Sequence, residues 1–340
     1  MIELLNQINE DVKNIFQYDI ETTNAYVVPN RHDQGLTFPI GNIKKGKLIE
    51  TCILFIDIRS STQISKSLRK DKIKLGKIYS SFIHAMTSIA DEYGYVRNIV
   101  GDRVMIVFEP NDCFVNAVNC AALMNTVSSR IIQKYSGLEN FKVGIGIDYG
   151  EMLVLKTGIQ KKFKEQSEYK GLVWVGDTAN IASKLTDFAG KEYNSPLYNV
   201  TYEYTGFQKI FKGYKNIPNT SFGLPSLLAP KLEEDYEYKF EKATSTSSLN
   251  ADDFNKKVEF GNEIKYDGKK VIDIKREARN GTASPILMSK KVYDEFKKAD
   301  PKSQHLQRLG TRIYPGLTYI TGGVYGGSPL YLEINQIKIG

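Results

Sequence analysis

The sequence has few of the residues that build disulfide frameworks or histidine-rich metal centres. Among its 340 residues there are three cysteines and three histidines. Cys52, Cys113 and Cys120 follow no Cys-x-x-Cys spacing, which argues against a disulfide scaffold or a zinc site and favours a reducing compartment. The histidines lie far apart in the chain, so a histidine-based metal site is not expected.

Long apolar runs are absent too. No stretch approaches the roughly 18 consecutive apolar residues that indicate a membrane span, and residues 1–17 lack the positive start and apolar core of a signal peptide. Leu5, Ile8 and Val12 recur at helical spacing, which predicts an amphipathic helix whose stripe packs on its own domain or on a partner chain. We therefore expect a cytoplasmic protein without a membrane partner.

Acidic residues are outnumbered by basic ones. The 39 Asp and Glu stand against 46 Lys and Arg, giving a formal net charge of +7. This balance fits a polyanionic ligand, such as a nucleotide or a nucleic acid, and equally a solvated lysine-rich surface. The 41% apolar content is ordinary for a globular protein, and the length allows one large domain or two modest ones.

Alternating strand and helix patterns run from residue 50 to residue 190. Strands are predicted at 51–57, 95–100, 103–108, 171–175 and, as a hairpin turning at Gly150, at 141–149 and 152–156; helices are predicted at 61–90, with a possible break near Gly76, at 111–135 and at 178–188. The order β-α-β-β-α-β is the ferredoxin-like pattern. We therefore predict an α+β fold in which helices flank a central, mostly antiparallel sheet.

Two carboxylates occupy positions where metal ions and a phosphate can meet. Asp57 ends an apolar strand and shares a face with Phe55. Ser61 or Thr62 can cap the following helix, whose free amides form a phosphate cradle. Asp102 lies at the turn between two further strands, which neighbour the first strand in a ferredoxin-like sheet. Paired carboxylates beside such a cradle suit two Mg²⁺ or Mn²⁺ ions.

A third motif supplies an amide and a cation. Asn180 and Lys184 stand four residues apart, hence on one face of the predicted helix, where they can stabilise charge that develops on a phosphate. Each motif also has an ordinary explanation: Asp57 as a turn residue, and Asn180 with Lys184 as a solvated helix face. Their combination in this order makes a nucleotide site the better hypothesis.

In this order the motifs resemble the class III adenylate/guanylate cyclase family. The matching segments are Phe55-x-Asp57-Ile-x-x-x-Thr62, Gly101-Asp102, Val143-Gly-Ile-Gly-Ile-x-x-Gly150 and Gly176-x-Thr-x-Asn180-x-Ala-Ser-Lys184. The resemblance covers residues 50–190. It implies the ferredoxin-like class III cyclase fold, and an activity that closes a nucleoside triphosphate into a 3′,5′-cyclic monophosphate.

The resemblance also implies roles for individual residues. It implies a homodimer with two composite sites, in which Asp57, Asp102 and the Ile58 carbonyl hold two Mn²⁺ or Mg²⁺ ions. Asn180 and Lys184 would then act across the interface on the transition state. The expected nucleotide-binding residues are Phe55, Arg59, Ser60, Ser61, Thr62, Asn98 and Val173.

A long segment separates this part of the chain from the family's next strand and helix, which resemble residues 284–296. The segment is rich in Tyr, Lys, Asn, Ser and Thr. We expect the chain to be organised as an N-terminal helix and lead-in at 1–49, a cyclase domain at 50–190 and 284–338, and a large insertion at 191–283 that serves dimerisation or regulation. The lysine-rich stretch at 157–170 is predicted to be an exposed arm that helps to pair the subunits.

Three positions depart from the purine cyclases of the family. Asn98 stands where these enzymes read the base with Lys or Glu, and Val173 stands where they use Asp, Cys or Thr. Lys184 replaces the usual Arg, a planar fork, with a point charge. The family also has a lysine late in the domain that contacts the triphosphate, and this sequence shows no counterpart of it. Arg308 or Arg312 can substitute for that lysine. These departures argue against ATP and GTP while leaving the metal chemistry in place.

Residues 57–62 resemble a narrower group, together with the lead-in segments Leu36-Thr-Phe-Pro and Lys44-Lys-Gly-Lys. They are similar to the pyrimidine cyclases of bacterial anti-phage Pycsar systems. This implies UTP or CTP as substrate, cyclic UMP or cyclic CMP as product, and an effector that the product activates without direct contact with the cyclase. An adenylate cyclase with unusual base contacts and a non-catalytic nucleotide sensor are the alternatives, and nucleic acid is not an expected partner.

Overall fold

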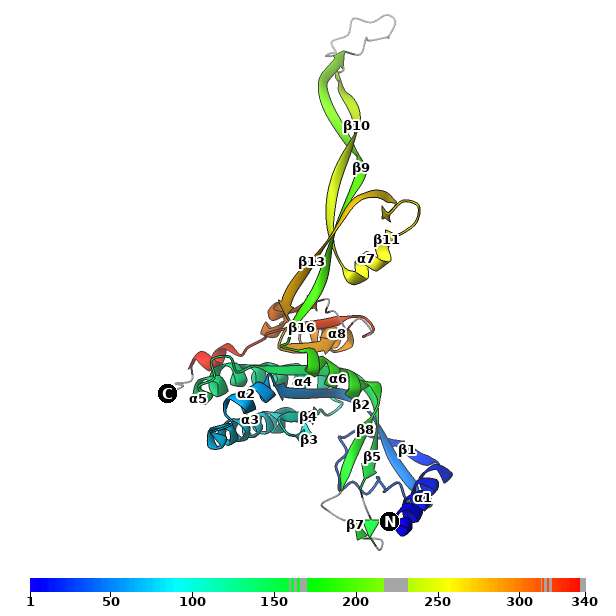
Figure 1. Ribbon diagram of the computed structural model, residues 1–340, viewed down its shortest axis with the longest axis vertical. Coiled ribbons are helices and arrows are strands. Elements are labelled where there is room, and N and C mark those ends of the chain that lie inside the picture. Colours follow the sequence, from blue (N-terminus) through cyan, green and yellow to red (C-terminus); the bar gives the residue numbers. More distant parts are fainter. Residues whose placement is uncertain are drawn as a thin grey trace, which may run out of the picture. The chain divides into compact units, whose positions relative to one another are not determined.

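The structure is a computed structural model that describes residues 1–158, 160–161, 164–165, 170–216, 232–312, 314, 317 and 320–336. The chain divides into two compact units, one of residues 1–193 and 282–340 and one of residues 194–281 (Figure 1). The boundaries of the second unit lie close to the ends of the expected insertion. The role of this segment in dimerisation or regulation stays a prediction.

A nine-stranded sheet forms the centre of the described part of the first unit. Its strands run in the order β15-β16-β14-β5-β2-β4-β3, with β1 beside β2 and β8 beside β5. Their bounds are β1 Ile20–Asn24, β2 Lys44–Ile58, β3 Tyr95–Val100, β4 Arg103–Val107, β5 Val143–Thr157, β8 Gly171–Val175, β14 Ile286–Ser289, β15 Leu309–Arg312 and β16 Val324–Gly327. Because β2 pairs antiparallel with both β5 and β4, while β14 runs parallel to β5, the sheet is mostly antiparallel, as predicted.

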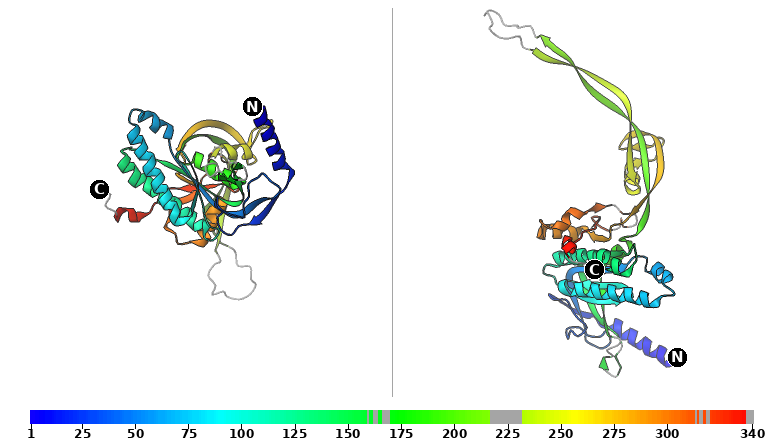
Figure 2. Two further views of the ribbon diagram at one scale, coloured as in Figure 1. Left: turned by 90° about the horizontal axis from the view of Figure 1, so that it is seen from below. Right: turned by 90° about the vertical axis from the view of Figure 1, so that its left-hand side faces the viewer.

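Helices and the N-terminal lead-in cover the two faces of this sheet. The helical segments are α1 Ile2–Gln17, α2 Ser61–Ser67, α3 Lys72–Tyr93, α4 Cys113–Val127, η1 Ser128–Ile132, α5 Gln133–Ser136, α6 Asp177–Phe188, α8 Lys290–Ala299, η3 Gln304–Arg308 and η4 Leu332–Gln336. The helices α3 and α4 lie side by side (Figure 2). Phe82 of α3 packs in the core on the face of the sheet that carries Leu54. On the opposite face, Ala182 of α6 belongs to a core that also contains Ile53 of β2 and Leu36 of the lead-in.

The strands β2 and β5 form a long central ladder. β2 begins at Lys44, whereas the sequence predicted a start at residue 51. β5 runs unbroken through Gly150, so the predicted hairpin turn is wrong. Gly150 pairs with Thr51, and a Cβ at this glycine would lie 2.5 Å from Thr178 Oγ1 of α6. The glycine is therefore needed for close approach of a helix and not for a turn.

The helix predicted at 61–90 is divided between α2 and α3, with the break at residues 68–71 and not near Gly76. The Asp71 side chain accepts a hydrogen bond of 2.9 Å from the Lys74 backbone nitrogen. This N-cap starts a new helix. Gly76 lies within α3, where a Cβ would meet no atom within 4 Å.

The amphipathic helix predicted at the N-terminus is confirmed as α1, but its apolar stripe is exposed. Leu5, Ile8 and Val12 keep 58%, 48% and 47% of their surface exposed, so the described part of their own unit does not cover them. Lys44 is buried and donates a hydrogen bond of 2.7 Å to the Ile15 carbonyl near the C-terminus of α1. A positive charge at this end of a helix stabilises it through the helix dipole. None of the described helices has the length and apolar character needed to span a membrane.

β8 carries Trp174, the one tryptophan of the sequence. This residue pairs with Val154 of β5 and packs, half-buried, against the core that lies under the lead-in. Its indole nitrogen is buried and has no hydrogen-bond partner among the described residues. Leu172 and Val173 precede it on the same strand.

The second unit is built on a long hairpin. In it, β9 pairs antiparallel with β10, in a sheet of order β10-β9-β13-β12-β11. The bounds are β9 Glu192–Asn216, β10 Leu232–Asn250, α7 Ala251–Lys257, β11 Val258–Glu259, β12 Lys265–Tyr266 and β13 Lys269–Thr282. Its own small core contains Val200, Leu249, Phe254, Val258 and Tyr266.

The predicted arm at 157–170 is described only in part. A short hairpin pairs β6, Gln160–Lys161, with β7, Lys164–Glu165. Residues 159, 162–163 and 166–169 lie outside the described residues. The role of the arm in pairing subunits therefore stays a prediction.

Candidate active site

Asp57 and Asp102 meet at the end of the central strands. Asp57 lies one residue before the end of β2, and Asp102 lies in the turn between β3 and β4, the latter paired with β2. Burial and the charge of Asp57 raise the pKa of the Asp102 carboxyl. The two carboxylates therefore lie close enough to repel each other. Asp102 Oδ2 is buried and has no hydrogen-bond partner among the described residues.

Arg103 is a cation at this site that the sequence analysis missed. Its Nη2 donates a hydrogen bond of 2.9 Å to Asp57 Oδ2 and also bonds the Asp187 carboxylate of α6. Its Nη1 donates a hydrogen bond of 3.1 Å to Ser183 Oγ. The sequence gives no specific signal for this contact, because Ser183 and Asp187 share a helix face in a spacing that does not identify Arg103 as their partner.

Arg59 lies beside the Asp57 carboxylate as a buried counter-charge. Its Nη2 lies 3.6 Å from Asp57 Oδ2, and its Nη1 donates a hydrogen bond of 3.3 Å to the Asp187 carbonyl. Burial lowers the pKa of Arg59, and the charge of Asp57 opposes that change. A Cβ at Gly144 would lie 2.5 Å from Arg59 Nε, so this glycine leaves room for the guanidinium. Contact of Arg59 with a nucleotide stays a prediction.

The segment after Asp57 differs in detail from the predicted phosphate cradle. α2 has seven residues, and its N-cap is Ser60, with a φ of 58° and no side-chain capping hydrogen bond. The expectation that Ser61 or Thr62 caps this helix is therefore wrong, because both lie within its first turn. Ile58 is buried at the end of β2. Separately, the half-buried Phe55 packs in the core under α6, and its carbonyl accepts a hydrogen bond of 3.1 Å from Thr186 Oγ1.

Asn180 and Lys184 line a pocket of about 440 Å³. Its lining also includes Asp148 of β5 and Lys291 of α8, two residues that the sequence analysis did not single out. Burial raises the pKa of Asp148 to about 6. Lys291 donates a hydrogen bond of 3.2 Å to its helical neighbour Glu295. The pocket thus combines an amide, two lysines and a buried carboxyl.

The helix α6 contributes residues to both of these places. Ser183 and Asp187 contact Arg103 beside Asp57, whereas Asn180 and Lys184 line the 440 Å³ pocket. The residues that line this pocket include neither Asp57 nor Asp102. This pocket therefore does not itself bring the expected transition-state residues to the expected metal ligands.

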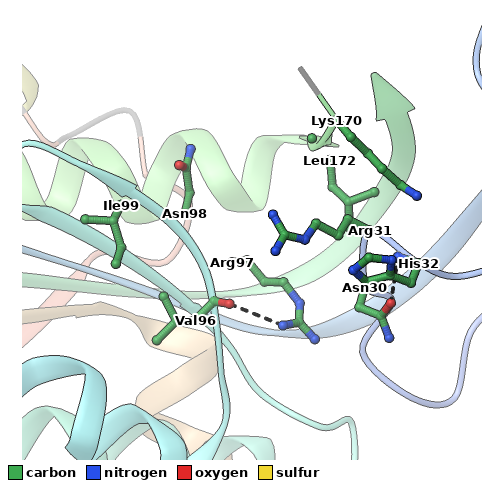
Figure 3. A pocket seen from close by; sticks show the side chains of 10 residues that line it. Asn30, Arg31, His32, Val96, Arg97, Asn98, Ile99, Lys170 and Leu172 are labelled. Atoms are coloured by element: carbon green, nitrogen blue, oxygen red, sulfur yellow. Dashed lines mark hydrogen bonds between the residues drawn. The ribbon is translucent and has the colours of Figure 1, made fainter. Parts of the chain in front are cut away.

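Asn98 lies on the edge strand β3 of the sheet. It is exposed on β3 and lines a pocket of about 710 Å³ together with Arg31 and Leu172 (Figure 3). Val173, the next residue of β8, is 44% exposed. Arg308 is exposed at the end of η3. The side chain of Arg312, the other substitute for the late lysine, lies outside the described residues.

The chemistry of Asp57 and Asp102 fits a divalent cation. The described residues contain no group of three or more His, Cys, Asp or Glu that could enclose a metal ion. Two carboxylates with an unpartnered buried oxygen are, however, a partial ligand set that substrate oxygens complete, which is the way Mg²⁺ binds with phosphates. The guanidinium nitrogen on Asp57 shows that this place attracts positive charge.

Comparison with known proteins gives a consistent result. Residues 43–203 match the model of the adenylate and guanylate cyclase catalytic domain. A uridylate cyclase of Gulbenkiania mobilis is 33% identical over 169 residues, which are 46% of this chain and 64% of that protein. A uridylate cyclase of Burkholderia cepacia is 30% identical over 181 residues, 52% of this chain and 72% of that protein.

A cytidylate cyclase of Staphylococcus aureus is also similar. It is 36% identical over 110 residues, which are 29% of this chain and 25% of that protein. The chain thus spans less than two thirds of the length of the Gulbenkiania and Staphylococcus proteins.

Proposed function

Because the chain belongs to the class III adenylate and guanylate cyclase family, we propose that it is a pyrimidine nucleotide cyclase. It converts UTP or CTP into 3′,5′-cyclic UMP or CMP. The ribose 3′-oxygen forms a bond to the α-phosphorus, the bond from that phosphorus to the bridging oxygen of the β-phosphate breaks, and diphosphate leaves while the 3′-hydroxyl proton is lost to solvent. The observation that carries this proposal is the adjacency of Asp57 and Asp102.

Each chain would contribute a metal-binding half-site. Asp57 and Asp102, with the Ile58 carbonyl, hold two Mn²⁺ or Mg²⁺ ions. When bound, these ions supply a lowered pKa at the 3′-hydroxyl and charge neutralisation at the triphosphate. Arg59, buried beside Asp57, places a positive charge against that carboxylate and helps to hold it in position.

The second half-site would come from a second copy of the chain. Asn180 and Lys184 line a pocket whose lining includes neither Asp57 nor Asp102 of their own chain, and a homodimer with two composite sites would bring the halves together. In such a site the amide of Asn180 and the ammonium group of Lys184 stabilise the charge that develops on the α-phosphate. Lys291, in the same pocket, is placed to contact the triphosphate, in the role for which Arg308 and Arg312 were candidates.

The assignment to pyrimidines rests on the missing purine contacts. Asn98 and Val173 replace the charged and polar residues with which the purine cyclases read a base. The uridylate and cytidylate cyclases among the relatives support the same substrate class.

We also propose that the cyclic nucleotide is a signal in anti-phage defence, made in the cytoplasm and acting on a separate effector protein. The support is the resemblance of residues 57–62 and of the lead-in to the pyrimidine cyclases of such systems. The test is the level of cyclic UMP and CMP in phage-infected cells. A rise is expected in cells that carry the wild-type chain and not in cells that carry Asp57→Asn.

A product assay tests the activity itself. The purified protein is incubated with each of the four nucleoside triphosphates and Mn²⁺, and the products are separated by chromatography. We expect cyclic UMP or cyclic CMP from the wild type and at least a hundred-fold less from Asp57→Asn, since a divalent-ion ligand is lost. Asp91→Asn, which changes an exposed carboxylate on α3, is the matched control and should retain activity.

The alternatives give other outcomes in the same assay. Cyclic AMP as the main product would identify an adenylate cyclase and would refute the pyrimidine assignment. Binding of nucleotides without any cyclic product, in the presence of either metal, would identify a non-catalytic sensor.

A further inference from the structure

The 710 Å³ pocket beside β3 is a built feature of the first unit. Its walls come from three separate segments, residues 30–32 of the lead-in, residues 96–99 of β3, and residues 170–172 at the start of β8. In the view of Figure 3 the guanidinium group of Arg31 lies between the side chains of Asn98 and Arg97. The lead-in, which the sequence showed only as an extended segment, thus forms one wall of a pocket that contains the expected base-reading position.

A β-bulge places Arg97 in this pocket. The pairing of β3 with β4 shifts register between Val96 and Asn98, so Arg97 is an extra residue on an edge strand. Bulges are common beside functional sites because they redirect a side chain. The edge strand therefore presents both Arg97 and Asn98 to the pocket, although neighbouring residues of a regular strand point to opposite faces.

The Arg97 guanidinium is held in place but is not fully satisfied. Its Nη1 donates to the Val96 carbonyl at 3.2 Å, its Nη2 donates to the Val28 carbonyl at 3.3 Å, and the group lies 4.7 Å from the centre of the Tyr95 ring. Its Nε is buried without a hydrogen-bond partner among the described residues. Two backbone hydrogen bonds and the contact with the Tyr95 ring therefore fix the guanidinium group at the wall of the pocket.

The polar lining of the pocket is dominated by hydrogen-bond donors. Arg31, Arg97 and Lys170 can only donate, whereas Asn30, Asn98 and His32 can donate or accept. No Asp or Glu is among the described residues that line the pocket. A ligand that presents oxygen acceptors therefore matches this surface, and a ligand that presents an amino group in the same place meets donors.

We infer that this pocket receives the base of the substrate and that Arg31 and Arg97 select uracil over cytosine. Uracil presents two carbonyl acceptors, O2 and O4, whereas cytosine carries an amino donor at C4 in place of O4. With uracil bound, the guanidinium groups meet carbonyl oxygens. With cytosine bound, an amino group faces a guanidinium group. Both are donors, so each loses its hydrogen bonds to water without gaining a new acceptor. This inference rests on the proposed pyrimidine cyclase activity and names UTP as the substrate.

The test measures kcat/KM for UTP and CTP in mixtures of the two. The wild type should prefer UTP by roughly ten-fold or more, which is the discrimination expected from one mismatched donor and acceptor. Arg31→Met should reduce this preference at least three-fold by slowing the UTP reaction. Arg31→Glu, which supplies an acceptor for the cytosine amino group, should reduce it further. Arg69→Met, an exposed arginine in the turn after α2, is the matched control and should leave the ratio unchanged.

Arg97 needs a conservative variant because it also anchors the Val28 carbonyl. Arg97→Lys keeps the charge but loses the buried Nε donor and the planar fork. Its preference for UTP should fall at least three-fold while its melting temperature stays within a few degrees of the wild type. A wild-type preference for CTP, or a UTP to CTP ratio that none of the Arg31 and Arg97 variants changes, would overturn the inference.

Failure of the proposed activity is distinguished by a binding measurement. If the wild type makes no cyclic nucleotide, the proposed function fails. Calorimetric titration of the wild type and of Arg31→Met with UTP and with CTP then decides the inference by itself. Tighter binding of UTP that Arg31→Met abolishes would support it, and equal binding of the two nucleotides by the wild type would refute it.

Discussion

Arg103 donates a hydrogen bond of 2.9 Å to the Asp57 carboxylate and bonds the Asp187 carboxylate on its other side. The guanidinium group thus links the end of β2 to α6. It also occupies part of the space in front of Asp57 that a divalent cation needs. Metal binding at Asp57 must therefore compete with Arg103 for the same carboxylate oxygen.

Removing this competitor should strengthen metal binding. We expect Arg103→Met to bind Mn²⁺ about ten-fold more tightly than the wild type in the absence of nucleotide, because one positive charge a few ångströms from the site is lost. Electron paramagnetic resonance of free Mn²⁺ measures this without any turnover. Arg69→Met, which changes an arginine outside the site, is the control. Unchanged or weaker Mn²⁺ binding by Arg103→Met would show that Arg103 does not compete with the metal.

The composite site predicts complementation between two inactive variants. Asp57→Asn removes an expected metal ligand and Asn180→Ala removes an expected transition-state residue, so each homodimer should be inactive. Because random exchange makes half of the dimers mixed, and each mixed dimer has one intact site, a one-to-one mixture should recover roughly a quarter of the wild-type rate. A mixture as inactive as its components, although exchange is demonstrated by size or label transfer, would contradict the two-chain arrangement.

Gly146 is required where α6 crosses the sheet. A Cβ at this position would lie 2.2 Å from the Ala182 carbonyl oxygen and 2.4 Å from the Thr186 backbone nitrogen. We expect Gly146→Ala to lower the free energy of unfolding by roughly 1–3 kcal/mol, since the helix backbone must move. Gly76→Ala is the matched control, because its Cβ meets no atom and a helical alanine should stabilise by up to about 1 kcal/mol. Urea denaturation of both variants measures the two opposite changes.

Ionisation of Asp148 should lower the free energy of unfolding as the pH rises. Burial raises the pKa of this carboxyl to about 6, so the folded chain retains its proton between about pH 4 and pH 6 while the unfolded chain releases it. The free energy of unfolding therefore decreases through that range and stays lower above it. Asp148→Asn cannot ionise and should be more stable than the wild type by roughly 2–3 kcal/mol at pH 7.5, with little difference at pH 4.

The measurement for Asp148 is urea denaturation at both pH values. Asp91→Asn, an exposed carboxylate on α3, provides the comparison for a simple loss of charge. A difference between the wild type and Asp148→Asn that is the same at pH 4 and at pH 7.5 would show that ionisation of this group is not the cause.

Much of the fold follows from local sequence patterns. The strands β3, β4 and β8 and the helices α1 and α6 appear within a few residues of their predicted positions, because apolar periodicity is strong in each. The helix predicted at 111–135 corresponds to the consecutive segments α4, η1 and α5. Two of the errors came from glycines. Gly150 and Gly76 were interpreted as a turn and a break, yet one admits α6 to the sheet and the other is a tolerated residue of α3. A sequence alone does not distinguish these uses.

The candidate site was predictable in part. Asp57 and Asp102 could be paired because both end neighbouring strands, and the structure places them together. The contacts of Arg103 with Asp57 and α6, and the bulge that directs Arg97 to a pocket, depend on tertiary packing and register. Neither leaves a signal in residue spacing. The same holds for Lys291, which reaches the pocket of Asn180 from a helix more than a hundred residues away in the chain.

The single tryptophan gives the chain an intrinsic optical reporter. Trp174 follows Leu172 and Val173 on the strand that borders the 710 Å³ pocket, and its half-buried indole lacks a hydrogen-bond partner within the described part of the chain. Its emission is therefore free of background from any other indole and is sensitive to changes of polarity at this strand. Nucleotide arrival can be followed by the fluorescence of the unlabelled wild-type protein, in real time and separately from turnover.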